Sequence, residues 1–151
     1  MTRLVYLTAM VVLGACVSGQ PVQQPRTEAR IVRATMQPTV DFAEGVALKL
    51  TGEGNPAVSQ LRIVERPNYR TPLHVHHKTD ETFFVVSGEL TLHVNGQTHR
   101  LGPGDYAFVP RDTPHAQGNQ TANESLIILT LVPGAFEGFF DDRAELVLET
   151  P

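Results

Sequence analysis

The sequence has little cysteine, little basic charge and no hydrophobic stretch that predicts a membrane-spanning helix. Cys16 is the single cysteine in 151 residues, which excludes a disulfide framework within one chain. The 12 basic and 16 acidic side chains give a formal net charge of −4 at pH 7. No basic cluster is present, and the mild acidity argues against binding to the phosphate backbone of nucleic acids. The apolar stretch at residues 4–15 is shorter than the about 20 residues that a transmembrane helix needs.

What is present at the N-terminus is typical of a processed leader. Residues 1–15 begin with a short positively charged segment, at Arg3, and continue as an apolar stretch, which predicts a signal peptide. The stretch ends in L-G-A-C, which resembles the bacterial lipoprotein box. The resemblance implies a lipid on Cys16, which would become the mature N-terminus, and a membrane-anchored protein of the cell envelope. Ordinary secretory cleavage that discards Cys16 is the alternative. Residues 17–30 are polar and proline-bearing, and we expect a flexible tether there.

Residues 31–151 are expected to form one all-β domain. Apolar and polar residues alternate with a period of two in 46–50, 61–63 and 89–94, as in half-buried strands. In the last run the leucines are expected inside and His93 outside. Asn95-Gly96 then predicts a tight hairpin. Many short strands joined by Gly, Pro and Asn turns indicate a sandwich or barrel, with one short helix expected in the C-terminal tail at residues 135–148.

One predicted strand, at residues 83–86, is apolar on both faces. We therefore expect it to be covered on both sides, which is compatible with a homodimer that buries one of them. Four aromatic residues either line a substrate pocket or simply pack the sandwich or barrel: Tyr69, Phe83, Tyr106 and Phe108.

Three histidines and one glutamate form the chemically informative set. His74 and His76 are two residues apart, so on a strand they point to one face, roughly 7 Å apart. Glu81 is two residues before Phe83, so on the next strand both side chains point to the same, interior face. An unpaired charge there is costly. His115 follows a proline-marked turn as a long-range fourth member. Three imidazoles and a carboxylate suit one divalent ion, with Fe, Mn, Ni, Co, Cu and Zn all compatible.

The spacing resembles the two sequence motifs of the cupin superfamily. The first is matched by His74-x-His76-x4-Glu81-x6-Gly88. The second is matched by Gly104-x5-Pro110-x-Asp112-x2-His115-x3-Asn119. Asn68 and Asp112 stand where the motifs have glycine, and both residue types tolerate a positive φ. The resemblance implies a double-stranded β-helix, the jelly-roll or cupin barrel, with the metal at one mouth.

A second resemblance concerns activity. The H-V-H-H run together with the tail sequence P-G-A-F-E-G-F-F is similar to small cupins of the quercetinase type, the flavonol 2,3-dioxygenases. It implies a metal-dependent oxidoreductase acting on a small phenolic or enolisable substrate, with Glu81 as catalytic base as well as ligand. Two alternatives stay open: a non-catalytic envelope module that binds a metal and a small molecule, and a cupin isomerase or decarboxylase.

Overall fold

The computed structural model describes residues 29–33, 35–36, 40–42, 44–51, 55 and 57–134. The predicted signal peptide, the lipidation site at Cys16 and the predicted helix at 135–148 lie outside the described residues. Lipidation and the envelope location therefore stay predictions. In the described part of the chain, no helix is long and apolar enough to span a membrane.

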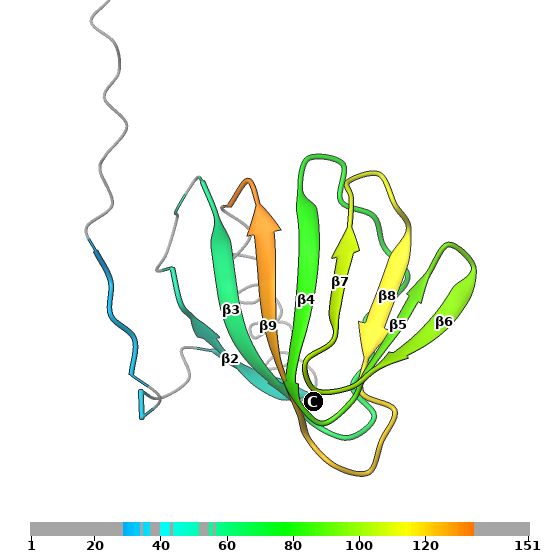
Figure 1. The fold of residues 1–151 in the computed structure, drawn as a ribbon, viewed down its shortest axis with the longest axis horizontal. Helices are drawn as coiled ribbons and strands as arrows, with labels where there is room; N and C mark the ends of the chain where they lie inside the picture. The colour runs from blue at the N-terminus through cyan, green and yellow to red at the C-terminus, as the bar shows by residue number, and fades with distance from the viewer. Residues whose placement is uncertain are drawn as a thin grey trace, which may run out of the picture.

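The described residues form an all-β structure of two antiparallel sheets, as the alternation predicts (Figure 1). The strands are β1 (Val40–Phe42), β2 (Gly45–Lys49), β3 (Ser59–Glu65), β4 (Asp80–Ser87), β5 (Leu90–Val94), β6 (Gln97–Leu101), β7 (Tyr106–Val109), β8 (His115–Gly118) and β9 (Ser125–Val132). The large sheet has the order β1-β2-β3-β9-β4-β7, and the small sheet has the order β6-β5-β8.

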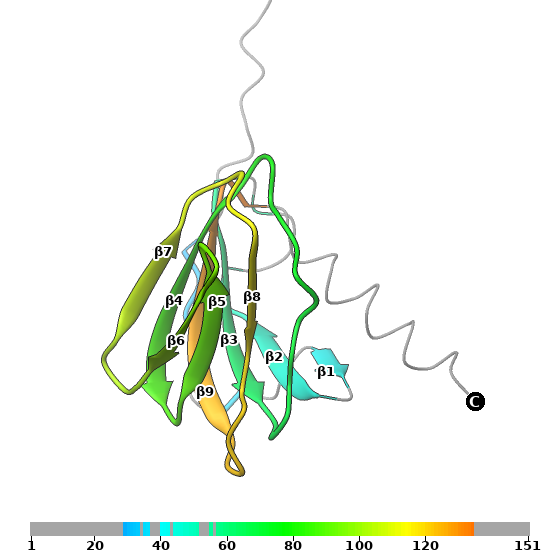
Figure 2. The same ribbon diagram turned by 90° about the vertical axis from the view of Figure 1, so that its right-hand side faces the viewer.

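The small sheet lies over one face of the large sheet, and apolar side chains fill the space between them (Figure 2). Leu61 and Ile63 of β3 are fully buried, and so is Leu90 of β5, as predicted from the alternation. Other large members of this core are Phe42, Tyr69, Phe83, Val85, Leu92, Val109, Ile127, Leu129 and Leu131. Burying each such side chain contributes about 1.5–3 kcal/mol to stability.

The turns adopt the backbone conformations that their sequences predict. Asn95 and Gly96 have φ values of 52° and 72°, and they join β5 to β6 as a two-residue hairpin. Asn68 and Asp112, which replace motif glycines, have φ values of 67° and 64°. These two residues occupy the left-handed region that glycine would otherwise supply, so the departures from the motif leave the turns intact.

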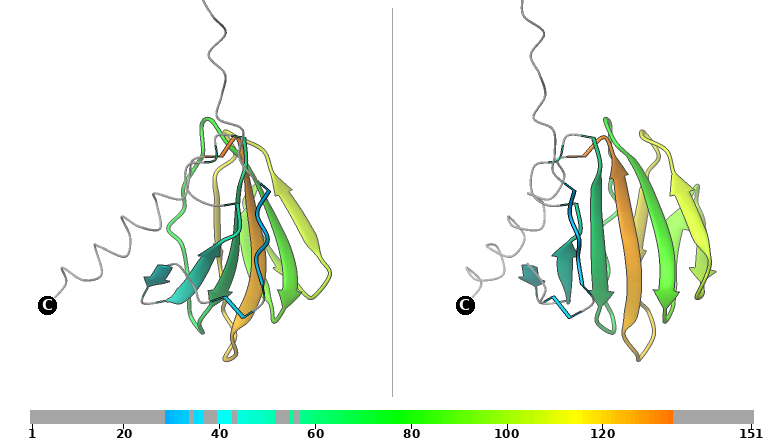
Figure 3. Two further views of the ribbon diagram at one scale, coloured as in Figure 1. Left: turned by 90° about the vertical axis from the view of Figure 1, so that its left-hand side faces the viewer. Right: turned by 60° about the vertical axis from the view of Figure 1, so that its left-hand side comes forward.

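The prediction that residues 83–86 are covered on both sides is wrong for the single chain. Phe83 faces the core, but Phe84 and Val86 are 42% and 43% exposed on the outer face of the large sheet. Residues 29–33 and 35–36 lie outside the large sheet (Figure 3), and the backbone oxygen of Met36 accepts a hydrogen bond of 3.5 Å from Arg62 of β3. Apolar composition alone does not reveal whether a further layer exists, because exposed apolar side chains are common on protein surfaces. The homodimer stays a prediction.

Candidate metal centre

The long loop between β3 and β4 carries the first two histidines to β8. Its residues 69–74 run antiparallel to that strand, and isolated bridges join Arg70 to Gly118 and His74 to His115. His74 and His115 exchange both backbone hydrogen bonds at 2.9 Å. The two histidines are 41 residues apart in sequence, and this short pairing places them side by side. His74 and His76 thus lie in an irregular extended segment rather than in the regular strand that the alternation predicts.

Gly118 permits the close approach of this loop to β8. A Cβ atom at position 118 would lie 2.2 Å from the backbone oxygen of Tyr69 and 3.0 Å from the Cα atom of Arg70. Both contacts are with backbone, which cannot move aside as a flexible side chain can. Any larger residue at this position forces the loop away from the strand that bears His115.

We expect Gly118→Ala to lower stability by about 1–3 kcal/mol, because of this overpacking, and to weaken metal binding by displacing His74. The matched control is Gly102→Ala, where the nearest neighbour of a new Cβ is an Asp105 side-chain oxygen at 3.9 Å. Thermal unfolding and metal titration of both variants check this. Equal behaviour of the two variants would contradict it.

The structure brings all four predicted ligands together. His74, His76, Glu81 and His115 each offer one ligand atom, and these atoms lie within 4.8 Å of one another. Nε2 of His115 lies 2.6 Å from Oε2 of Glu81, and Nε2 of His76 lies 3.4 Å from the same oxygen. Ligand atoms about 2.1 Å from a common ion lie roughly 3–4 Å apart. The cluster needs only a small contraction to hold one ion.

The hydrogen bonds of two imidazoles also fit a metal. Nδ1 of His74 lies 2.8 Å from the carbonyl oxygen of Pro72, and Nδ1 of His115 lies 2.8 Å from that of Thr113. A carbonyl only accepts, so each Nδ1 is the donor, and Nε2 is left to act as ligand. Metal-binding histidines are usually oriented in this way. The side chains of Glu81 and His115 are only 5% and 2% exposed, so this side of the cluster is shielded from water, whereas His74 and His76 are partly exposed.

Charge states at the site follow from burial opposed by hydrogen bonding. Burial raises the pKa of Glu81, but hydrogen bonds from His115 and His76 outweigh it and hold that pKa below its ordinary value. Burial lowers the pKa of His115, but the carboxylate of Glu81 and a backbone carbonyl raise it above its ordinary value overall. At His74 burial prevails and the pKa is lowered. A cation binds the ionised carboxylate and neutral imidazoles, so metal binding would displace the proton that the raised pKa favours on His115.

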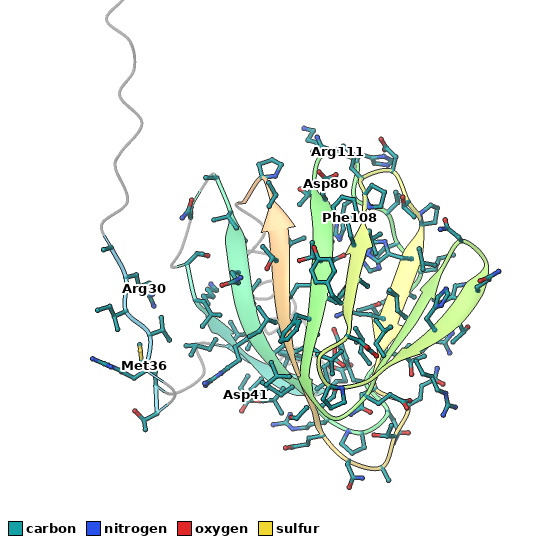
Figure 4. The ribbon with its side chains drawn as sticks, viewed as in Figure 1. Arg30, Met36, Asp41, Asp80, Phe108 and Arg111 are labelled. Atoms are coloured by element: carbon teal, nitrogen blue, oxygen red, sulfur yellow. The ribbon has the colours of Figure 1, made fainter. Side chains whose placement is uncertain are left out.

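A salt bridge next to the site fixes the start of β4. Both carboxylate oxygens of Asp80 accept hydrogen bonds from the Arg111 guanidinium, at 2.9 and 2.8 Å, and one also accepts from the Arg111 backbone N–H. Figure 4 shows the two residues close together where β4 begins. The Arg111 hydrogen bonds lower the pKa of Asp80 to about 2. The pair therefore ties the turn that precedes His115 to the residue that precedes Glu81.

The four aromatic residues near the predicted site divide between core and surface. Phe83 is buried with its ring centroid 6.4 Å from that of His115, and Tyr69 is buried against Phe42. Tyr106 and Phe108 are 59% and 57% exposed on the outer face, so they do not line the barrel.

Two further polar residues of the motifs lie outside the cluster of ligands. His77 points away from the cluster and contacts Asp112. Asn119 of the second motif donates hydrogen bonds to the backbone carbonyls of Glu65 and Asn123.

Sequence reasoning missed one buried carboxyl group. Glu65, at the end of β3, is fully buried and contacts Ser125 and Gln117 through its side chain. The sequence could have predicted its burial, because Glu65 is two residues after Ile63 and alternate residues of a strand share a face. Glu65 pairs with Ser125 and Glu81 with Leu131 on β9, which separates the two carboxyl groups by roughly 20 Å along the strand.

Comparison with known proteins finds similarity to cupins in the central part of the chain. Residues 62–132 match the family model described as "Cupin domain". Quercetin 2,3-dioxygenase of Bacillus subtilis is 37% identical over 67 residues, which are 44% of this chain and 20% of that protein. The HTH-type transcriptional regulator PuuR of Escherichia coli is 31% identical over 96 residues, 62% of this chain and 52% of the regulator. Dimethylsulfoniopropionate lyase DddQ of Ruegeria pomeroyi is 34% identical over 93 residues, 58% of this chain and 45% of the lyase.

These relatives are matched over about half of their length or less, and they range from a dioxygenase to a lyase and a regulator. Among solved structures, KdgF from Halomonas sp. superposes with a TM-score of 0.62 at 19% identity. That match covers 70% of this chain and 95% of KdgF, and at this identity it supports the fold alone.

Proposed function

Because residues 62–132 of this chain are a cupin domain, we propose that the protein is a mononuclear metal-dependent oxidoreductase, similar to dioxygenases, for a small phenolic or enolisable substrate. The observation that carries the proposal is the convergence of three imidazoles and one carboxylate within 4.8 Å. The 37% identity to a quercetin dioxygenase over 67 residues supports the choice of reaction class.

His74, His76, Glu81 and His115 would hold the ion. When bound, a divalent metal supplies a Lewis acid that lowers the pKa of a substrate hydroxyl. Three neutral ligands leave a net positive centre, which favours an enolate or phenolate over a neutral molecule.

Glu81 has a second role in this proposal, as the base that takes the substrate's hydroxyl proton. Its Oε2 atom contacts both His115 and His76, so the carboxylate can accept a proton while the imidazoles stay in place. Phe83 packs beside His115 and keeps that side of the site apolar. An apolar, shielded site strengthens the interaction of the carboxylate with a nearby proton.

Replacing Glu81 with glutamine is expected to reduce turnover more than metal content. The amide keeps the shape of the side chain but cannot accept the substrate proton, and loss of a general base costs about 10²–10⁴-fold in rate. Glu124→Gln removes an exposed carboxylate and is the matched control. Metal-dependent O2 uptake with a panel of flavonols and catechols measures turnover, and elemental analysis measures occupancy.

The outcomes separate the alternatives. O2 uptake by the wild type that is absent in His76→Ala supports the oxidoreductase. Equal loss of metal and turnover in Glu81→Gln would leave Glu81 as a ligand only. Substrate turnover without O2 would favour a cupin isomerase, decarboxylase or lyase. The similarity to the lyase DddQ supports this alternative. Metal binding with no turnover of any panel member would leave a binding module.

A further inference from the structure

A cavity lies on the outer face of the small sheet, on the side opposite the metal centre. It has a volume of about 230 Å³. The lining residues that carry the argument are Arg70, Leu73, Thr91, His93, Thr98 and Ala116. His115 and Ala116 are consecutive in β8, so their side chains point to opposite faces. The cavity and the metal centre are therefore separated by one thickness of sheet.

The strand register explains why the sheet is hollowed there. Thr91 pairs with Gly118, and His93 pairs with Ala116 on one side and Thr98 on the other. Glycine and alanine on β8 leave space between the larger side chains of β5 and the loop. Arg70 and Leu73 of that loop form the opposite wall.

Thr91 supplies an observation that points to a ligand. It is only 4% exposed, although alternation places it on the outer face of β5. Its Oγ1 atom is buried and has no hydrogen-bond partner among the described residues. Buried polar atoms are rarely left without a partner, so a hydroxyl in this state in a cavity wall is suited to pair with a bound molecule.

The charged groups around the cavity favour an anion. The described ion pairs of arginine involve Arg66, Arg100 and Arg111, and none involves Arg70. None of the described residues that line the cavity is an aspartate or a glutamate. His93 contacts Thr98 through Nδ1 at 3.1 Å and adds no negative charge. A guanidinium and a hydroxyl donor are the groups that bind a carboxylate, and the guanidinium can do so through two parallel hydrogen bonds.

We propose that this cavity binds a small organic carboxylate, with the carboxylate on Arg70 and Thr91 and an apolar body against Leu73 and Ala116. The volume sets the size of the ligand, because sites for drug-sized molecules measure about 300–1,000 Å³. The site shares no residue with the metal centre. Its position behind His115 means that occupancy would fix the loop that carries His74.

The test uses the full chain and benzoate as the probe, with benzamide as its uncharged isostere. Isothermal titration should show saturable binding of benzoate and at least tenfold weaker binding of benzamide. Arg70→Gln should weaken benzoate binding at least tenfold, and Thr91→Val should weaken it severalfold. Arg30→Gln is the matched control, since Arg30 is an exposed arginine outside both sheets and is absent from the cavity wall.

Benzoate could also reach a metal ion, so the titration is repeated on His74→Ala/His115→Ala. Binding that persists there and is lost in Arg70→Gln supports the cavity. The proposal is overturned if benzoate fails to bind at millimolar concentration, if Arg70→Gln and Arg30→Gln bind it equally, or if binding disappears with the metal ligands. Circular dichroism and thermal unfolding of each variant establish that lost binding is not lost folding.

Discussion

The wild-type protein is expected to hold about one divalent metal ion per chain, and His74→Ala/His115→Ala is expected to hold none. The double substitution removes two of the four ligands and both of the imidazoles whose Nδ1 atoms are fixed by backbone carbonyls. The two remaining groups, His76 and Glu81, do not form a closed site for a divalent ion. Elemental analysis by ICP-MS of the purified protein after dialysis against each candidate ion measures this directly.

Metal binding should also stabilise the fold, because only the folded chain brings the four ligands together. At a free metal concentration 100 times the Kd, the gain is about 2.7 kcal/mol. The wild type should therefore unfold at a higher temperature with metal than with a chelator, and the double variant should not respond. The matched control is His77→Ala/His99→Ala, which removes two exposed histidines outside the cluster. A wild type that takes up no ion, or a control that loses it equally, would contradict the metal centre.

The second large effect is expected at Glu65, far from the metal centre. Burial raises the pKa of Glu65 from 4.5 to about 8, and the hydrogen bond from Ser125 only partly offsets this. The folded chain thus keeps the Glu65 proton up to about pH 8, whereas the unfolded chain releases it near pH 4.5. Because the folded state binds the extra proton in that window, stability falls as pH rises.

The unfolding free energy of the wild type should fall by about 1.4 kcal/mol per pH unit between about pH 5 and about pH 8 through this group. Glu65→Gln should lack this dependence, because its amide is neutral at every pH and can still meet Ser125 and Gln117. Subtracting one stability profile from the other cancels the contributions of the histidines. Urea unfolding from pH 5 to pH 9 gives both profiles, with Glu124→Gln as the exposed control. Parallel profiles for wild type and Glu65→Gln would show that Glu65 is ionised in the folded state.

Several features of the fold and of the site could be predicted from sequence because they depend on local chemistry. The hairpin at Asn95-Gly96 requires only that these residues adopt a positive φ, and they do. Asn68 and Asp112 follow the same steric rule. The inward placement of Leu61 and Ile63 follows from the two-residue period of a strand.

The four ligands were also predicted, but from the motif spacing together with residue type rather than from geometry. Their convergence depends on contacts between residues far apart in the chain. His74 meets His115 only because the loop pairs with β8, and the loop approaches that closely only because position 118 has no Cβ atom. An expectation of a regular strand at His74 and His76 was therefore too simple.

By itself, the sequence determined the all-β class and the left-handed turns, since each depends on periodicity or on a residue's own backbone preference, and it singled out the four candidate metal ligands through motif spacing and donor type. The tertiary structure decided which faces are covered, because burial depends on what packs opposite a strand. It leaves Phe84 and Val86 exposed, encloses Glu65 within the core and buries the hydroxyl of Thr91 in an outer cavity. Alternation assigns a side chain to a face of a sheet, but only the folded chain determines what that face meets.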